Sequence, residues 1–217
     1  VMRFCHALMT ELYRHIGADR DVPAGDIGVG AREVGFMAGM MKKLTTQADC
    51  VFTGRGLSWG GSLIRPEATG YGTVYFAREM MQRAGQSLEG KTVSVSGSGN
   101  VSQYAIEKAM QCGAKVITAS DSNGTVVDEA GFTKEKLARL IDIKERAHGR
   151  VADYAREFGL TYLEGQQPWS VPVDIALPCA TQNELDVDAA RVLIANGVKA
   201  VAEGANMPTT IEATDLF

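Results

Sequence analysis

The sequence predicts an α/β fold in which a doubly wound, mostly parallel sheet occupies most of the chain. The first observation is residues 92–121, where a β-branched run passes through two glycines into a helical pattern and then into a second β-type run. The second is that strand and helix patterns keep alternating after residue 121. Such alternation is typical of parallel sheets covered by helices on both faces.

The residues before this region carry two helical patterns and one short strand. Residues 1–16 repeat apolar side chains at helical spacing, and Gly17 is expected to stop that helix. Residues 32–44 form a second helix whose methionines are expected to fill a core. Residues 50–53 have the composition of a short strand. The glycine-rich residues 54–61 are the best candidate for a hinge between two domains.

The elements of the second region follow from local signals. Pro66 and Glu67 are typical of a helix start, and that helix is expected to reach about Arg83. An Asn-Gly pair within residues 122–128 predicts a small hairpin, and Thr133 is expected to begin another helix. The remaining patterns predict helices over residues 151–158 and 188–195, strands over 161–163, 174–178 and 199–203, and a helix start at Pro208.

Composition excludes several classes of partner. The net charge is −4 and 22% of the residues are charged, so the sequence has no basic footprint for nucleic acid or an anionic membrane. It has neither an apolar run long enough to span a bilayer nor a signal segment. We expect a cytoplasmic protein without a metal site, because its cysteines are scattered and are typical of reduced, buried thiols: Cys5, Cys50, Cys112 and Cys179.

The glycine turn within residues 92–121 predicts a Rossmann-like dinucleotide site. Gly97 permits a tight turn, Gly99 lets the backbone approach a pyrophosphate, and Ser102 is small enough for close helix packing. An acidic residue, Asp121, follows Gly99 by 121 − 99 = 22 residues, about the distance of a ribose-binding carboxylate. The expected cofactor-binding residues here are Gly97, Ser98, Gly99, Asn100, Val101 and Asp121. The alternative is a purely structural strand-turn-helix unit.

Further polar residues that are candidates for ligand binding or catalysis lie in loops and at a helix start. Asn183 and Asn206 follow two later strands, and open parallel sheets bind ligands at the carboxyl edges of their strands. Asp26 lies among small and rigid residues, and local chemistry alone makes it a turn or N-cap residue. Thr69 is a hydroxyl in the first turn of the expected helix.

The chain resembles the glutamate dehydrogenase family, in particular its hexameric NADP-type bacterial members. The matching stretches are residues 21–30, 60–72, 94–101, 177–184 and 202–210, in the family's order. The resemblance implies reversible oxidative deamination of L-glutamate to 2-oxoglutarate and ammonium by a homohexamer. It implies that Asp26 is the catalytic acid/base and that Gly25 contacts the substrate through its backbone. Thr69 and Asn100 would contact the cofactor, with Asn183 and Asn206 beside its ribose and nicotinamide.

The resemblance also assigns roles to the two regions. It covers all 217 residues but only about half of a family member. Residues 1–60 would be the C-terminal part of a substrate and oligomerisation domain with α/β structure. Residues 61–217 would be a dinucleotide-binding domain that is incomplete at its C-terminal end. The family's catalytic lysines would precede Val1 and its substrate-closing serine loop would follow Phe217, so we expect the chain alone to be inactive.

The cofactor is predicted from two opposing signals. A carboxylate at Asp121 favours NAD, because it would repel the 2′-phosphate of NADP. Ser122 and the basic residues Lys136, Lys144 and Arg146 could instead bind that phosphate. Together with the resemblance, they predict NADP, with Ser122 and Lys144 as contacts and NAD as the less favoured cofactor.

Two other functions remain open from the sequence. A related dehydrogenase acting on leucine, valine or phenylalanine would share the fold and the carboxylate. A non-catalytic nucleotide-binding module would share only the glycine turn.

Overall fold

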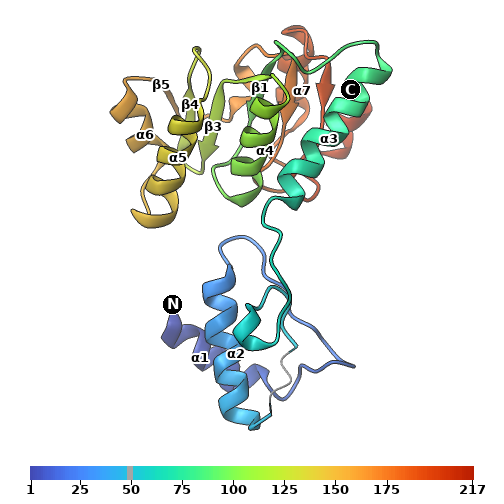
Figure 1. The fold of residues 1–217 in the computed structure, drawn as a ribbon. Coiled ribbons are helices and arrows are strands. Elements are labelled where there is room, and N and C mark those ends of the chain that lie inside the picture. Colours follow the sequence, from blue (N-terminus) through green and yellow to red (C-terminus); the bar gives the residue numbers. More distant parts are fainter. Residues whose placement is uncertain (48–50) are drawn as a thin grey trace. The chain divides into compact units, whose positions relative to one another are not determined.

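The computed structural model describes residues 1–47 and 51–217, and it separates the chain into two compact units, Val1–Arg65 and Pro66–Phe217 (Figure 1). The roles assigned to the two regions remain predictions. Among the described residues, no helix combines the length and apolar character needed to cross a membrane.

The first unit is a small helical assembly. Helix α1 (Met2–Leu12) packs against α2 (Ala31–Thr45), and a short 3₁₀ helix, η1 (Leu57–Trp59), follows. Their shared core contains Met9, Ile16, Val34, Ala38, Met41 and Phe52, with Met37 and Met40 packed at its margin. The expectation that the methionines of residues 32–44 fill a core is therefore confirmed.

Two expectations for this unit are wrong. Helix α1 ends at Leu12, because the His15 N–H bonds to the Leu12 carbonyl in a tighter turn, and Ile16 then forms a bridge with Asp21. Gly17 is therefore not the cap of α1. Residues 51–53 form no strand, and Cys50, where that strand was expected to begin, lies outside the described residues.

The second unit is built on a parallel sheet. Its strands are β1 (Thr92–Val95), β2 (Lys115–Val116), β6 (Ile175–Leu177) and β7 (Ala200–Val201), in the order β2-β1-β6-β7. From β1 the chain first adds β2 on one side and later adds β6 and β7 on the other. The strand order therefore changes direction at β1, which is where such sheets bind ligands at their carboxyl edge.

Three further strands pair antiparallel beside this sheet. They are β3 (Thr118–Asp121), β4 (Gly124–Val127) and β5 (Thr161–Glu164), in the order β3-β4-β5. The predicted hairpin is present as β3 and β4, and its two turn residues are Ser122 and Asn123. The chain passes directly from β2 to β3, where the Thr118 hydroxyl bonds to both the N–H and the carbonyl of Val95.

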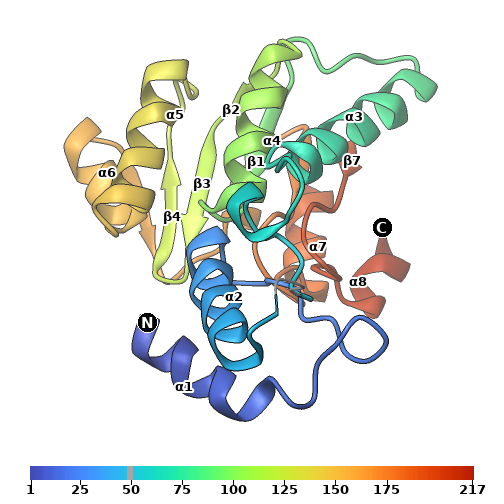
Figure 2. The ribbon, with the colours of Figure 1, turned by 60° about the horizontal axis from the view of Figure 1, so that its bottom comes forward.

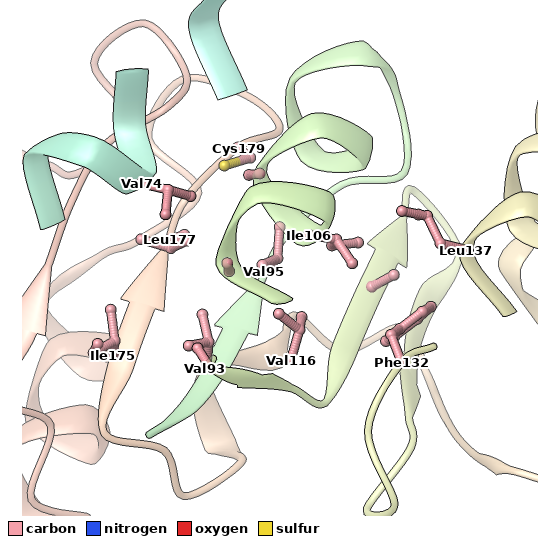
Figure 3. Packing of buried hydrophobic residues seen from close by; sticks show 14 of the residues in the cluster. Val74, Val93, Val95, Ile106, Val116, Phe132, Leu137, Ile175, Leu177 and Cys179 are labelled. Carbon is pink, nitrogen blue, oxygen red and sulfur yellow. The ribbon is translucent and has the colours of Figure 1, made fainter. Parts of the chain in front are cut away.

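Helices cover both faces of the parallel sheet (Figures 1 and 2). Helices α3 (Ala68–Arg83) and α4 (Asn100–Gln111) pack on the face that buries Val93, Ile175 and Leu177 (Figure 3). The neighbouring residue Ala176 points to the opposite face and packs against η3 (Pro168–Ser170), α7 (Val187–Ala195) and α8 (Ile211–Leu216). This alternation of buried faces confirms the predicted doubly wound α/β fold.

A third group of helices packs against the antiparallel strands. Helix α5 (Lys134–Ile141) begins at the Thr133 N-cap and continues into a π-helical turn, η2 (Asp142–Arg146), before α6 (Val151–Phe158). The π-helical turn carries Lys144. Helix α3 starts at Ala68, two residues later than Pro66 suggested, with Glu67 as its N-cap.

Candidate functional site

The turn after β1 has the backbone geometry that a phosphate cradle needs. Gly97 has φ +82°, and a Cβ there would lie 3.1 Å from the Cys179 carbonyl oxygen and 3.3 Å from the Ala180 Cβ. Gly99 is exposed, and a Cβ there would meet open space. In the structure as described, no side chain caps α4, whose N-cap is Gly99. The first N–H groups of this twelve-residue helix are therefore available to an anion.

The small residues around this turn hold α4 close to its neighbours. Ser102 is buried, and its hydroxyl donates to the Gly99 carbonyl at 3.0 Å. Ser98 is also buried, and its carbonyl accepts from the Gln103 side chain at 2.9 Å. Val101 is half-buried against the core. Ser98, Ser102 and Val101 therefore fix the shape of the turn, while Gly99 and Asn100 form its exposed part.

Thr69 and Asn100 lie near each other through the contact between α3 and α4. The Asn100 amide donates to the Pro66 carbonyl at 2.8 Å, just before α3 begins. A Cβ on Gly70 would lie 2.5 Å from the Val101 carbonyl oxygen and 2.6 Å from the Ala105 nitrogen, so the two helix backbones are in close contact there. Thr69 is exposed in the first turn of α3. Thr69 and the exposed end of α4 thus belong to one surface.

The loops after β6 and β7 are joined to the turn after β1. The Ser96 hydroxyl accepts from the Cys179 N–H at 2.8 Å and donates to the Glu184 carboxylate at 2.9 Å. Asn183 is exposed with φ +55°, and its N–H bonds to the Met207 carbonyl at 3.0 Å, next to the exposed Asn206. The structure therefore brings the two predicted asparagine loops to the same sheet edge as the glycine turn.

Asp121 is tied to groups of its own chain. One carboxylate oxygen accepts from the Asn123 N–H and the other from the Val151 N–H, both at 2.9 Å. Lys144 Nζ lies 3.5 Å from the second oxygen, and only 7% of the Asp121 side chain is exposed. The carboxylate is thus held by the hairpin, by the start of α6 and by one cation.

Two basic side chains lie at the end of β3, where Ser122 follows Asp121. The Arg150 guanidinium donates to the Ser122 hydroxyl at 3.1 Å, and Lys144 Nζ donates to the Gly149 carbonyl at 3.2 Å. Arg150 is exposed and is the N-cap of α6, and its own N–H bonds to the side chain of Asp153, the third residue of that helix. Ser122, Lys144 and Arg150, which we call the Ser122 cluster, form a compact group of donors over the buried Asp121 carboxylate.

The other two basic candidates are engaged elsewhere. Lys136 forms an ion pair with the buried Asp128, and Arg146 lies 3.5 Å from Asp142 on the π-helical turn. Arg150 had not been predicted from the sequence. Arg150 lies 28 residues after Ser122, and no local sequence pattern indicates their contact.

Asp26 belongs to a turn of the first unit. Its carbonyl accepts from the Val29 N–H at 2.8 Å, and Gly28 has φ +75° in the turn between them. A Cβ on Gly25 would lie 2.8 Å from the Val29 carbonyl oxygen, so this position requires glycine. The Asp26 side chain is exposed. The turn is therefore fixed by backbone contacts, and it leaves the carboxylate accessible.

Glu184 is a half-buried acid at the sheet edge that sequence reasoning did not single out. Burial raises the pKa of its carboxyl group, against the opposing effect of donors from Ala180, Ser96 and Thr181. Burial also raises the pKa of the neighbouring Cys179 thiol, which is therefore unreactive as a nucleophile.

Comparisons with known proteins give close matches over the whole chain. The chain is 82% identical over all 217 residues to the NADP-specific glutamate dehydrogenases of Salmonella typhimurium and Escherichia coli, and it spans 48% of each. The crystal structure of Plasmodium falciparum glutamate dehydrogenase is 49% identical with a TM-score of 0.88, covering 100% of this chain and 46% of that one. The chain thus spans about half the length of the relatives it matches.

Two family models match the chain. Residues 1–43 match the Glu/Leu/Phe/Val dehydrogenase dimerisation domain, and residues 60–217 match the Glutamate/Leucine/Phenylalanine/Valine dehydrogenase model. The second match covers most of the chain and includes the glycine turn, the Ser122 cluster and both asparagine loops. The chain belongs to the glutamate/leucine/phenylalanine/valine dehydrogenase family.

Proposed function

We propose that this chain is the cofactor-binding and acid/base portion of an NADP-dependent glutamate dehydrogenase. The observation that carries the proposal is that the chain is 82% identical, over all 217 residues, to NADP-specific glutamate dehydrogenases. The reaction would be the reversible oxidative deamination of L-glutamate to 2-oxoglutarate and ammonium. This activity belongs to the full-length enzyme, by which we mean a polypeptide that contains this chain and is as long as the relatives that the chain matches.

The second unit would hold the dinucleotide. The turn Gly97, Ser98, Gly99, Asn100 and Val101 would receive the pyrophosphate, because glycine backbone and uncapped helix N–H groups suit an anion. Thr69, Asn183 and Asn206 would lie beside the nicotinamide and its ribose. A side chain at Gly97 would contact the loop after β6, so the turn accepts the cofactor only with glycine there.

The Ser122 cluster would select NADP. The carboxylate of Asp121 is occupied by two N–H groups and Lys144, which reduces its repulsion of a phosphate. Lys144 and Arg150 would then supply charge-assisted hydrogen bonds to the 2′-phosphate, with the Ser122 hydroxyl between them.

Asp26 would move protons in the reaction. When bound, NADP would accept the hydride from the α-carbon of glutamate. Asp26 would shuttle protons to and from the substrate nitrogen and water, and the Gly25 backbone would contact the substrate. The exposed Asp26 carboxylate and the glycine-dependent turn that presents it support this role.

We also propose that the full-length enzyme is a cytoplasmic homohexamer. Residues 1–43 match a dimerisation domain, and a relative from Thermus thermophilus is described as a hetero-hexamer. The cysteines among the described residues carry free thiols, which suits a reducing compartment: Cys5, Cys112 and Cys179.

The test is a substrate comparison with the purified full-length enzyme. Reduction of NADP should depend on L-glutamate, with kcat/KM at least about 10²-fold above those for leucine, valine and phenylalanine, because a site built to bind a polar substrate group strongly rejects analogues that lack that group. A preference for one of the apolar amino acids would assign the chain to a different branch of the family. Cofactor binding without turnover of any of the four would indicate a binding module.

A further inference from the structure

We propose that Glu184 is a positioning residue for the cofactor, because its carboxylate ties together the loops that form the nucleotide-binding edge of the sheet. This inference rests on the proposed function and extends it. Glu184 lies in the loop between β6 and helix α7, and no candidate cofactor contact includes it.

One oxygen of Glu184 binds three donors from two loops. Its Oε1 accepts from the Ser96 hydroxyl at 2.9 Å, the Ala180 N–H at 2.9 Å and the Thr181 N–H at 3.3 Å. Ser96 immediately precedes Gly97, whereas Ala180 and Thr181 belong to the loop after β6. The contact therefore fixes the distance between the glycine turn and that loop, which already approach each other closely at Gly97.

The backbone around Glu184 extends this link to the third loop. The neighbouring N–H groups of Asn183 and Leu185 bond to the carbonyls of Met207 and Pro208 at 3.0 and 2.9 Å. The Glu184 carbonyl itself accepts from the Trp169 indole at 2.9 Å. Glu184 thus lies where the loops carrying Gly97, Asn183 and Asn206 meet, with its main chain fixed on both sides.

A carboxyl group at this position costs stability and therefore needs an explanation. Its second oxygen, Oε2, is buried and has no hydrogen-bond partner among the described residues, and the ion pairs of those residues do not include Glu184. An apolar side chain would avoid this cost, but it could not accept from Ser96, Ala180 and Thr181. The carboxylate therefore has a structural reason to be there: its Oε1 accepts these three hydrogen bonds.

The test compares three variants of the full-length enzyme. Glu184→Ala removes the acceptor, so the loops lose their link and the Kd for NADPH should rise about tenfold, the effect of leaving a buried donor unpaired. Glu184→Gln keeps an acceptor oxygen and should stay within about threefold of the wild type. Glu129→Ala removes an exposed carboxylate in the same unit and should change nothing.

The kinetic readout separates positioning from a general loss of structure. In Glu184→Ala, KM for NADP should rise with Kd, whereas kcat at saturating cofactor and KM for glutamate should stay within about twofold, since the loss is one of cofactor binding. A parallel fall in kcat without a change in Kd would contradict the proposal. So would a Glu184→Ala enzyme that binds NADPH as tightly as the wild type.

A double-mutant cycle tests the Ser96 link and covers a failure of Glu184→Ala to fold. Ser96→Ala breaks the same contact from the other side, so it should raise the Kd for NADPH while Glu184→Gln does not. The increase in Kd in the double variant Ser96→Ala, Glu184→Ala should be smaller than the product of the increases in the two single variants, because each substitution removes the same link. Independent effects would contradict the proposal. A wild type that binds no NADPH would instead contradict the proposed function.

Discussion

At the scale of single residues, the backbone and the side chain of Asp26 have different roles: the backbone forms the turn, and the side chain is the proposed acid/base. The Asp26 turn uses the backbone carbonyl of this residue, with the side chain left exposed. An amide in place of the carboxylate should therefore keep the turn intact and remove only the group that can accept a proton.

We therefore expect Asp26→Asn to act on turnover alone. The full-length variant should lose about 10² to 10⁴-fold in kcat, the usual range for a missing general acid/base, with the Kd for NADPH unchanged. Steady-state kinetics and a cofactor titration measure the two quantities. A kcat within a few-fold of the wild type would leave Asp26 as a turn residue only.

The residues of the glycine turn could be predicted from sequence because their chemistry is local. Gly97 needs a positive φ and close packing, and both requirements appear in the spacing of a single motif. Arg150 and Glu184 could not be predicted in the same way. Arg150 reaches Ser122 across 28 residues and Glu184 reaches Ser96 across 88, and no local pattern indicates either contact.

At the scale of elements, the crossing of α3 and α4 depends on one glycine. A Cβ on Gly70 would meet backbone atoms of α4 at 2.5 and 2.6 Å, and neither can move without moving the helix. Gly72, on the same helix, is exposed and would place a Cβ in open space. The two glycines therefore form a matched pair for testing this contact.

The two alanine substitutions should have opposite effects on stability. Gly70→Ala should destabilise the protein by about 1–3 kcal/mol through overpacking, and Gly72→Ala should stabilise it by up to about 1 kcal/mol through higher helix propensity. The midpoint of thermal unfolding measures both. Equal shifts in the two variants would show that α3 and α4 do not meet as described.

At the opposite edge of the sheet, Asp174 joins the starts of three strands. It accepts from the Thr92 N–H and hydroxyl, and it forms an ion pair with Lys199 at 2.6 Å. Burial alone would raise the pKa of Asp174, but the Lys199 and Thr92 donors outweigh it and hold that pKa below its usual range. A lowered pKa in the folded state stabilises the protein above the unfolded value of about 3.9, and this stabilisation is lost at lower pH.

Asp174→Asn should therefore have a pH-dependent effect. The variant should be less stable than the wild type at pH 7 by about 1 kcal/mol, and the difference should shrink as the pH falls below the unfolded value, because the stabilisation by the wild-type carboxylate is lost there. Unfolding midpoints at several pH values test this. A difference that is constant with pH would mean that Asp174 acts through packing rather than through its charge.

The parallel core of the fold could be predicted because helix and strand periods alternate clearly from residue 92. The hairpin of β3 and β4 could also be predicted, from the Asn-Gly pair. The antiparallel pairing of β5 with β4 could not, since a short strand does not specify its partner. Likewise, the apolar spacing of residues 1–16 continues past Leu12, although the backbone turns there. Local sequence patterns therefore do not predict the parts of the fold whose geometry depends on tertiary contacts.

At the scale of the whole molecule, the residues assigned to the proposed reaction are divided between two compact units. The first unit carries the Asp26 turn, and the second carries the glycine turn, the Ser122 cluster and the loops linked by Glu184. Cofactor choice depends on the state of the Asp121 carboxylate. Asp121 taken alone favours NAD, whereas its engagement by Asn123, Val151 and Lys144 favours NADP.

The most direct test is kcat/KM for NADP and for NAD in the full-length enzyme and in Lys144→Ala and Arg150→Ala, with Arg146→Ala as the control on the same π-helical turn as Lys144. The wild type should strongly prefer NADP. Each variant of the Ser122 cluster should lower kcat/KM for NADP about tenfold or more, the effect of one charge-assisted hydrogen bond, and should leave the value for NAD unchanged. Arg146→Ala should match the wild type. Equal use of NAD by the wild type, or an NADP preference that survives both substitutions, would contradict the account.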